Sequence, residues 1–319
     1  MKILEENRGQ SVSGQELAER LGISRAGIWK QIQALRDAGY RIDAVQNRGY
    51  CLAQNNDKLS RQGILPYLEE PERAEKIFVF DVLDSTNTEA KRRALGGAPD
   101  GTVILADRQT AGRGRLGREF YSPANSGVYF TVLLRPNIPM EQAGMFTTAA
   151  SVAAMEAVKA VTGKQPLIKW VNDLYLDGRK VCGILTEAVS NFETGVIEAV
   201  AVGIGINCTT VFPEELREKA GSLFPENGES AVRNRLAAEL VNRTVHLEDC
   251  IAEGNFMEKY RRYSMVLGKT VTVLQEPGSQ YLAEEIGNGG ELILRGRTGE
   301  RRVLRTGEVS IRLTETIDK

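Results

Sequence analysis

Histidine is almost absent from this sequence. The single one among 319 residues is His246, which ends a stretch with helical spacing, Leu240–His246, where a packing or surface role is the better interpretation. Catalytic groups built on an activated histidine, and metal sites held by several histidines, are therefore almost excluded. We expect any catalysis to work through electrostatics and through the positioning of reactants.

Cysteine is sparse and scattered. The four residues include no C-x-x-C pair, so they fit reduced cytosolic thiols better than a disulfide framework or a zinc site. Met1–Asn7 lacks the apolar core of a signal peptide, and Glu156, Lys159 and Glu198 interrupt the most apolar stretches. We expect a cytoplasmic protein that does not bind membranes. The cysteines are Cys51, Cys182, Cys208 and Cys250.

The chain also lacks an excess of charge of either sign. It has 41 basic and 42 acidic residues, so no global field indicates binding to nucleic acid or to a membrane. The first 55 residues are mildly basic, with eight Lys or Arg against six Asp or Glu. That asymmetry gives weak support for a DNA-facing domain.

Glycine and arginine are concentrated in one segment, Gln109–Arg118. It follows the apolar run Thr102–Ala106 and interleaves three arginines with three glycines. Glycine allows close approach of the backbone to a ligand, and arginine offers forked donors for phosphate or carboxylate. The segment fits neither the G-x-x-x-x-G-K-[ST] nor the G-x-G-x-x-G motif. Composition leaves open whether it binds phosphate, forms a flexible basic loop or grips RNA.

The first 55 residues predict a winged helix-turn-helix. Ser13 opens a capping box for a helix that we expect to carry Leu17, Ala18 and Leu21 inward, and Gly22 makes the turn. A second helix, capped by Ser24, has the spacing of a recognition helix, and the segments 40–45 and 49–52 pair as a wing. The alternative is a small helical interaction domain. The residues expected to face DNA are Ser24, Arg25, Trp29, Lys30, Gln33 and Arg48.

The rest of the chain changes character twice. After the polar break 55–58, which we interpret as a linker, apolar runs predict strands at 77–80, 102–106, 128–134 and 196–206. Asp177-Gly178 predicts a hairpin turn, and long helices are expected at 140–161 and 231–251. The last 60 residues carry short β-prone runs at 270–274, 291–294, 301–304 and 309–313, which predict a small barrel.

Four motifs in order resemble those of the biotin protein ligases, in particular the bifunctional ligases that also repress the biotin operon. Gly-Arg-Gly-Arg-x-Gly-Arg at 112–118 resembles the family signature, with Ser85–Asn87 upstream and Lys169–Asp173 and Gly203–Asn207 downstream. Two residues depart from the family pattern. Phe120 stands where Trp is usual, and Val171 replaces the Pro of K-W-P-N-D.

The resemblance implies an α/β (α+β) protein of three domains. A winged helix-turn-helix would occupy residues 1–57, a mixed α/β ligase domain of the biotin/lipoate type 58–260, and an SH3-like barrel 261–319. The implied reaction has two steps: the biotin carboxylate attacks the α-phosphate of ATP to give biotinyl-5'-AMP, and a lysine of a biotin carboxyl carrier protein then takes the biotinyl group. Attack on phosphate needs two anions brought together and the developing charge neutralised, which suits a chain without catalytic histidines.

Site residues follow from the resemblance, position by position. Lys169, Arg115 and Arg118 are expected to be catalytic, and Mg²⁺ is expected to enter mainly through ATP, with Asp173 as the candidate protein ligand. We expect 209–228 to close over the adenylate, with Leu223 or Phe224 covering adenine. The expected biotin-binding residues are Ser85, Thr86, Asn87, Gln109, Arg113, Gly114, Arg115, Lys169, Gly203 and Gly205. The expected ATP-binding residues are Arg113, Arg115, Arg118, Asn172, Asn207 and Arg312.

The expected partners are the carrier protein, double-stranded operator DNA and, in the adenylate-bound state, a second copy of the chain. Two alternatives remain open. One is a ligand-sensing transcription factor without turnover, although binding alone does not require the full cationic set that includes Arg115 and Lys169. The other is a lipoate-type acyl ligase, against which the R-G-R motif and the amino-terminal domain argue.

Overall fold

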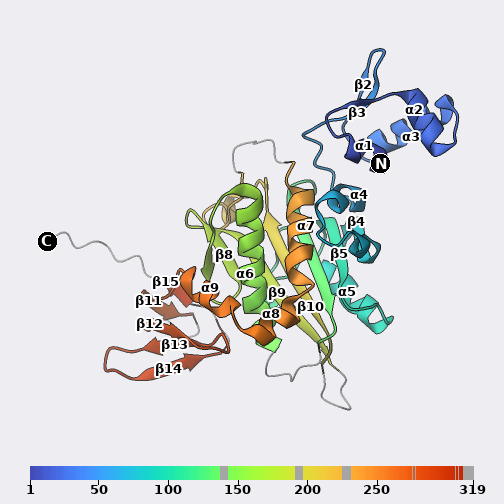
Figure 1. The fold of residues 1–319 in the computed structure, drawn as a ribbon. Coiled ribbons are helices and arrows are strands. Elements are labelled where there is room, and N and C mark those ends of the chain that lie inside the picture. Colours follow the sequence, from blue (N-terminus) through green and yellow to red (C-terminus); the bar gives the residue numbers. More distant parts are fainter. Residues whose placement is uncertain are drawn as a thin grey trace.

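Three β-sheets, one for each part of the chain, organise the fold (Figure 1). The computed structural model describes residues 1–136, 143–190, 197–224, 231–274, 276, 278–305, 307 and 309–311. Each sheet falls within one of the three expected domain ranges, and the boundaries themselves stay predictions. None of the helices within these ranges is long and apolar enough to cross a membrane.

The amino-terminal domain is a winged helix-turn-helix with a core of its own. Ser13 and Ser24 accept hydrogen bonds from the backbone N–H of Glu16 (3.0 Å) and Gly27 (3.1 Å), so both predicted caps are confirmed. The wing is also confirmed, whereas the short first strand was not predicted. The elements are α1 (Lys2–Glu6), β1 (Ser11–Val12), α2 (Gly14–Leu21), α3 (Arg25–Asp37), β2 (Ile42–Val45) and β3 (Gly49–Leu52), with sheet order β1-β3-β2.

The prediction that Leu21 points inward was wrong. Leu17 and Ala18 are buried, but Leu21 is 53% exposed. Leu21 is the last residue of α2, and Gly22 follows it with φ 65°. The small core ends before this last turn, and periodicity alone does not reveal where a core ends.

The central domain is built on a seven-stranded sheet. Its neighbouring strands are antiparallel except for β4 and β5, which are parallel. The strand order is β4-β5-β6-β10-β9-β8-β7. The strands are β4 (Ile77–Leu83), β5 (Thr102–Gln109), β6 (Gly127–Leu134), β7 (Leu167–Lys169), β8 (Asp173–Leu176), β9 (Arg179–Ser190) and β10 (Ile197–Asn207).

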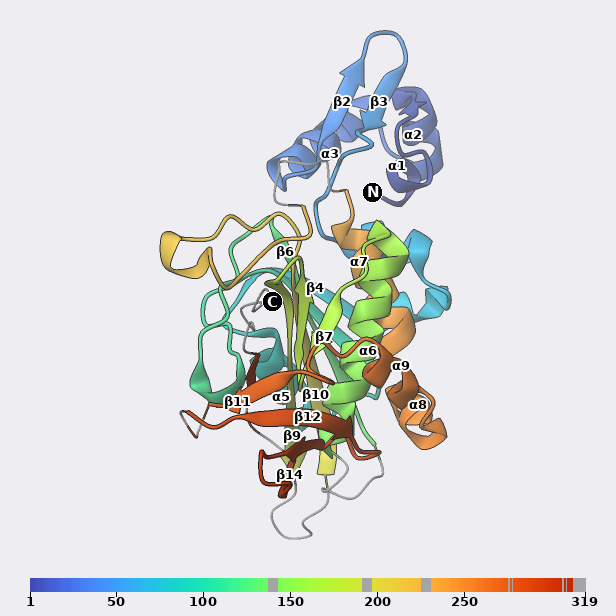
Figure 2. The ribbon, with the colours of Figure 1, turned by 90° about the vertical axis from the view of Figure 1, so that its left-hand side faces the viewer.

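Helices cover both faces of this sheet (Figure 2). Val103 and Leu105 of β5 point into the main core, whereas Ile104 packs with Ala90 of α5 on the opposite face. This alternation places α5 against the face that carries the candidate site. The helices are α4 (Arg61–Ile64), α5 (Thr86–Leu95), α6 (Ala143–Thr162), α7 (Arg233–Thr244), α8 (Leu247–Glu253) and α9 (Phe256–Arg262), with 3-10 turns at Leu65–Tyr67, Pro71–Lys76, Arg115–Gly117 and Glu214–Leu216.

The helix predictions for this domain need one correction. The expected helix over 231–251 is two helices, α7 and α8, which break at Val245 and His246. His246 occupies the N-cap position of α8, and its Nε2 lies 3.0 Å from a carboxylate oxygen of Glu70. Residues 140–142 of the other expected helix, and residue 196 of the expected strand, lie outside the described residues.

The carboxy-terminal domain is a five-stranded antiparallel sheet of the kind expected for an SH3-like domain. Its apolar residues join the core of the central domain, and the indole N–H of Trp170 donates a 2.9 Å hydrogen bond to the carbonyl oxygen of Gly290. The predictions missed β12. The strands are β11 (Thr270–Val273), β12 (Tyr281–Ile286), β13 (Leu292–Arg295), β14 (Arg301–Leu304) and β15 (Val309–Ile311), in the order β14-β13-β12-β11-β15.

Candidate functional site

A cavity of about 130 Å³ lies where the start of α5, the arginine-rich loop after β5 and strand β10 meet. It brings together most of the residues that the sequence assigned to biotin and to the phosphates. Among them are Ser85, Thr86, Asn87, Gln109, Arg113, Gly114, Arg115, Arg118, Asn172, Asp173, Gly203 and Gly205. Residues from four separate motifs therefore share one cavity.

Two glycines of β10 allow this cavity to form. A Cβ at Gly203 would overlap the side-chain oxygen of Asn87, and a Cβ at Gly205 would lie 2.6 Å from the ring of Phe120. Phe120, which departs from the family pattern, thus packs directly on the strand. Its ring and that of Tyr129 form a T-shaped pair with centroids 6.5 Å apart. Glycine in this strand is required because side chains approach the backbone.

A buried polar network fixes the start of α5. The backbone N–H of Thr86 donates to Oε1 of Gln109 (2.9 Å), and the hydroxyl of Thr131 donates to Oδ1 of Asn87 (2.7 Å). Ser85 occupies the N-cap position, but its side chain makes no capping hydrogen bond. Ser85 lines the cavity, and its hydroxyl is not used to cap the helix.

Glu187 of β9 anchors the same network from the other side. Its carboxylate accepts a hydrogen bond from the amide of Asn87 (2.8 Å) and pairs with Lys91 (2.5 Å). Burial opposes ionisation of Glu187, but Lys91 and Asn87 outweigh it and hold its pKa below the ordinary value. Asn87 is thus hydrogen-bonded to β6 and β9 and lies against Gly203 of β10.

The arginine-rich loop folds back on itself. The N–H of Gly114 donates to the carbonyl of Arg118 (2.7 Å), and that of Phe120 donates to the carbonyl of Gly112 (2.9 Å). A Cβ at Gly112 would lie 2.6 Å from the Phe120 carbonyl oxygen, so only glycine fits this crossing. Arg115 reaches out of the loop to Oδ1 of Asn172 (3.3 Å) and to the carbonyl of Gly307 (3.1 Å) in the carboxy-terminal domain.

A second, larger cavity of about 780 Å³ adjoins the first. Lys180, at the start of β9, lines both cavities, and its Nζ lies 2.6 Å from Oδ1 of Asp173. Sequence reasoning missed Lys180. The available signal was its place two residues after the predicted Asp177-Gly178 turn, which returns the chain beside the K-W-x-N-D motif.

Lys169 lies in the second cavity and does not line the first. Its Nζ is 3.5 Å from the hydroxyl of Tyr175 and 5.2 Å from the centre of that ring. The catalytic role of Lys169 stays a prediction. The geometry adds Lys180, which lines both cavities, as a second candidate.

The residues expected to cover adenine lie elsewhere. Leu223 is fully buried, and the ammonium of Lys164 lies 4.8 Å from the ring centre of Phe224; neither side chain lines the two cavities. Tyr121 and Phe212 do line the second cavity, with ring centroids 6.1 Å apart. Residues 225–228 of the expected closing loop, and Arg312, lie outside the described residues.

Asn207 lines the second cavity. Its amide N–H donates to the carbonyl of Gly221 (3.2 Å), and its Oδ1 is buried without a hydrogen-bond partner among the described residues. A buried acceptor without a partner is costly, so this atom is suited to receive a donor from a ligand.

The described parts of the chain contain no group of three His, Cys, Asp or Glu side chains that could hold a metal ion. Asp173, the candidate ligand, is already paired with Lys180.

The predicted DNA-facing residues lie on one exposed region of the helix-turn-helix. Ser24, Arg25, Trp29 and Lys30 are exposed, Trp29 to 55%, and Gln33 is partly exposed. Arg48 is exposed at the tip of the wing. A role in DNA binding stays a prediction for each of these residues.

Comparison with known proteins identifies the chain. Residues 79–207 match the Biotin/lipoate A/B protein ligase family, and residues 1–51 match an HTH domain. The Aquifex aeolicus biotin protein ligase, solved in complex with biotin and ATP, is 28% identical with a TM-score of 0.62 and covers 74% of this chain and 98% of its own. Fold and site thus define a ligase of the biotin/lipoate class joined to a helix-turn-helix domain.

Relatives narrow this class further. The bifunctional ligase/repressor BirA of Bacillus subtilis is 39% identical over 225 residues, which cover 70% of this chain and 69% of that protein. The Salmonella typhimurium BirA is 30% identical over 312 residues, which cover 96% of this chain and 95% of that protein. The chain belongs to the family of bifunctional biotin ligases and repressors.

Proposed function

We propose that the chain joins biotin to ATP to form biotinyl-5'-AMP and pyrophosphate, and then transfers the biotinyl group to a lysine of a biotin carboxyl carrier protein. In the first step an oxygen of the biotin carboxylate bonds to the α-phosphorus and the bond to pyrophosphate breaks. In the second, the lysine amine bonds to the biotinyl carbonyl and AMP leaves. Neither step requires a nucleophile from the enzyme.

The observation that carries this proposal is the convergence of Arg113, Arg115, Arg118 and Lys180 on one cavity, with Lys169 in the adjoining one. Two anions must meet there, and preorganised cations reduce their repulsion and stabilise the charge that develops on the phosphate. The first cavity is the proposed biotin site, held by Thr86, Asn87 and Gln109. The second is the proposed nucleotide site.

In the nucleotide site we assign two kinds of contact. Tyr121 and Phe212 offer aromatic surfaces for the adenine ring, in place of the residues expected from the sequence. The unpartnered Oδ1 of Asn207 is positioned to accept a hydrogen bond from the nucleotide. Mg²⁺ would enter bound to the phosphates of ATP and neutralise part of their charge, with Asp173 as the candidate protein ligand.

We further propose that the adenylate-bound chain forms a homodimer that binds double-stranded operator DNA through two recognition helices. The arginine-rich loop and residues 209–224 would have an open and a closed state, and a ligand buried beneath them would bind these two states with different free energies. This difference can favour dimerisation. A two-fold dimer would place α3 of each copy in a major groove of a two-fold operator.

The ligase assignment is tested by mixing the protein with biotin, ATP, Mg²⁺ and a biotin carboxyl carrier domain, and probing with streptavidin. We expect labelling of the carrier at one lysine, and no labelling when that lysine is arginine or when ATP is omitted. Replacement of biotin by lipoate distinguishes the lipoate-type ligase. Ligand binding without labelling or pyrophosphate release would support a sensor without turnover.

A further inference from the structure

The polar segment between the DNA-binding and ligase domains is held from both sides. On the side of the DNA-binding domain, Nη1 of Arg8 donates to the carbonyl of Asn56 (2.7 Å). The backbone N–H of Arg41 donates to Oδ1 of Asn56 (2.9 Å). Asn56 is only 1% exposed. A flexible tether would leave these groups in water, so the segment is structured despite its polar composition.

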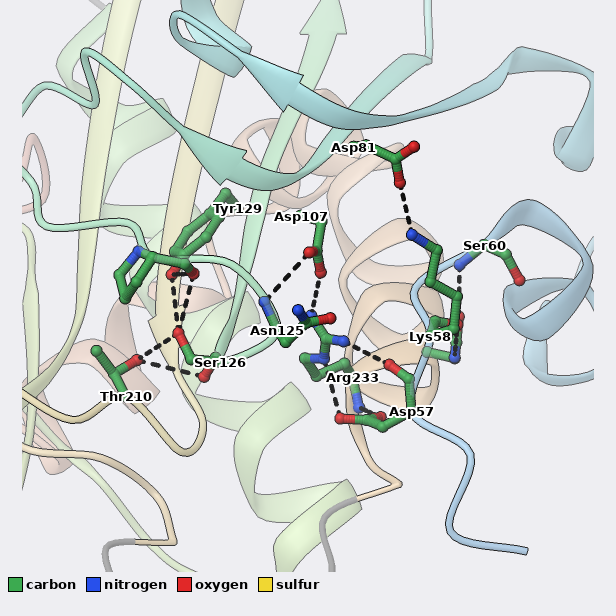
Figure 3. Close-up of polar contacts among 12 residues, drawn as sticks. Asp57, Lys58, Ser60, Asp81, Asp107, Asn125, Ser126, Tyr129, Thr210 and Arg233 are labelled. Carbon is green, nitrogen blue, oxygen red and sulfur yellow. Dashed lines mark hydrogen bonds and ion pairs between the residues drawn. The ribbon is translucent and has the colours of Figure 1, made fainter. Parts of the chain in front are cut away.

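On the ligase side, Arg233 at the start of α7 forms hydrogen bonds with the same segment (Figure 3). Its Nε donates to Oδ2 of Asp57 (2.9 Å), its Nη2 donates to the carbonyl of Asp57 (2.6 Å), and its backbone N–H donates to Oδ1 of Asp57 (3.0 Å). The neighbouring Asn234 accepts from the N–H of Ser60 (3.0 Å) and donates to the carbonyl of Lys58 (3.0 Å). Asp57 is thus fixed by three separate donors of one residue.

Arg233 is also tied to the framework of the ligase site. Its Nη1 donates to Oδ1 of Asp107 on β5 (2.6 Å), two residues before Gln109. Asp107 Oδ2 accepts from the N–H of Asn125 (3.2 Å), and the adjoining Ser126 carbonyl accepts from Thr209 (2.8 Å) in the segment after β10. One buried guanidinium therefore connects the linker with β5, whose Gln109 lines the first cavity, and, through Asp107, with the turn at Asn125.

The chemistry of this cluster makes it rigid. Arg233 is 2% exposed, and it faces two carboxylates whose side chains are 22% (Asp57) and 8% (Asp107) exposed. Loss of either carboxylate would leave a buried charge uncompensated, which is strongly destabilising. The folded protein therefore keeps both ion pairs of Arg233. Burial raises the pKa of Asp57, and the attraction of Arg233 offsets only part of that effect. The nearby Arg8 contributes further positive charge from the DNA-binding domain.

We propose that Arg8, Asn56, Asp57, Arg233 and Asp107 form a rigid joint that orients the DNA-binding domain relative to the ligase domain. This proposal rests on the proposed DNA-binding function. When two ligase domains dimerise, the joint sets the spacing of the two recognition helices. When the two DNA-binding domains of a dimer are rigidly placed and one is bound, the other has a high effective concentration at the second half-site. Loosening the joint reduces this effective concentration.

The test compares full-site and half-site binding. The probes are a duplex that the wild-type protein selects from a random-sequence pool and the same duplex with one half-site scrambled. Asp57→Asn is expected to bind the full-site duplex ~10-fold more weakly, because effective concentration is lost, and to bind the half-site duplex as the wild type does. Biotinyl-adenylate synthesis, measured on the same sample, is expected to stay within about twofold of the wild type, since Asp57 lines neither cavity.

Asp81→Asn is the matched control. Asp81 makes the same kind of contact close by, a 2.5 Å ion pair with Lys58, but its side chain is 83% exposed. Its loss is expected to leave both affinities unchanged. A second variant, with four Gly/Ser residues inserted after Asn55, loosens the segment without removing a buried charge and is expected to reproduce the full-site loss.

A measurement independent of DNA completes the test. From ¹⁵N relaxation, the DNA-binding domain should tumble with the ligase domain in the wild type and independently in the insertion variant. Full-site affinity that is unchanged in both variants would overturn the proposal, as would independent tumbling in the wild type. Equal losses on full-site and half-site duplexes would also overturn it, since they indicate damage to the DNA-binding domain. A wild-type protein that selects no duplex contradicts the proposed DNA-binding function instead.

Discussion

Single residues test the proposed chemistry of the site, and Lys180 is one of those at the border of the two cavities. It lines both cavities and pairs with Asp173. In the proposed reaction its ammonium stabilises the charge that develops on the α-phosphate, so Lys180→Ala should slow adenylate formation by ~10²-fold or more. Biotin affinity should fall much less. Pyrophosphate release measures the step, and Lys76→Ala, which removes a surface lysine, is the control.

Lys169→Ala is expected to show a loss of the same order if the assignment from the K-W-x-N-D motif is right. Measuring both lysine variants under saturating ATP separates their roles. Unchanged pyrophosphate release after loss of Lys169 would remove that residue from the catalytic set. The same result for Lys180 would contradict the geometry of the two cavities.

Gly203 shows how strictly one position can be limited. A Cβ there meets the side chain of Asn87, which cannot move aside because Glu187 and Thr131 hold it. Such overpacking costs about 1–3 kcal/mol, so Gly203→Ala should weaken biotin binding about tenfold or more. Gly144→Ala is the control, because nothing lies within 4 Å of a Cβ at that position. Titration calorimetry with biotin decides, and equal affinities of the two variants would refute the argument.

At the scale of elements, the junction of α5 with β9 should respond to pH. The pKa of Glu187 lies below its ordinary value in the folded state, so its ionisation stabilises the fold above the unfolded pKa of roughly 4.3. This contribution is lost as the pH falls through the folded pKa. The melting temperature of the wild type should therefore exceed that of Glu187→Gln near pH 6, and the difference should shrink below about pH 4. A difference that is constant across this range would contradict the assigned ion pair.

The two loops that border the cavities should become more ordered with ligand. The arginine-rich loop contains Gly112, Gly114 and Gly117, and glycine raises the entropy cost of holding one conformation. We expect the amides of 112–118 and part of 209–228 to exchange rapidly in the free protein and slowly with biotinyl-adenylate. Equal exchange in both states would argue against closure of the loops over the ligand.

Elements were predicted well where the pattern was local. The caps at Ser13 and Ser24 and the turn at Asp177-Gly178 depend on a few neighbouring residues, and the structure has all three. The predictions failed where tertiary contacts decide. The break at His246 and the exposure of Leu21 depend on what packs against each helix, and Lys180 becomes part of the site only because β8 and β9 pair.

At the scale of the whole molecule, the chain separates DNA recognition from catalysis. Arg25 lies on the exposed face of α3, whereas the cavities lie in the ligase domain. Arg25→Ala should weaken operator binding about tenfold or more, since a dimer loses one such contact at each half-site. Biotinylation of the carrier should be unchanged. Matched losses in both activities would mean that the recognition helix or the domain boundary is misplaced.

We propose that one intermediate, biotinyl-adenylate, serves both ligation and DNA binding. It is tested most directly by following the occupancy of a selected duplex while a carrier domain is added to the adenylate-bound protein without free ATP. We expect a carrier with its acceptor lysine to consume the adenylate and release the duplex, and a carrier with arginine at that position to leave the duplex bound. Biotinylation of the carrier with no change in duplex occupancy would contradict it.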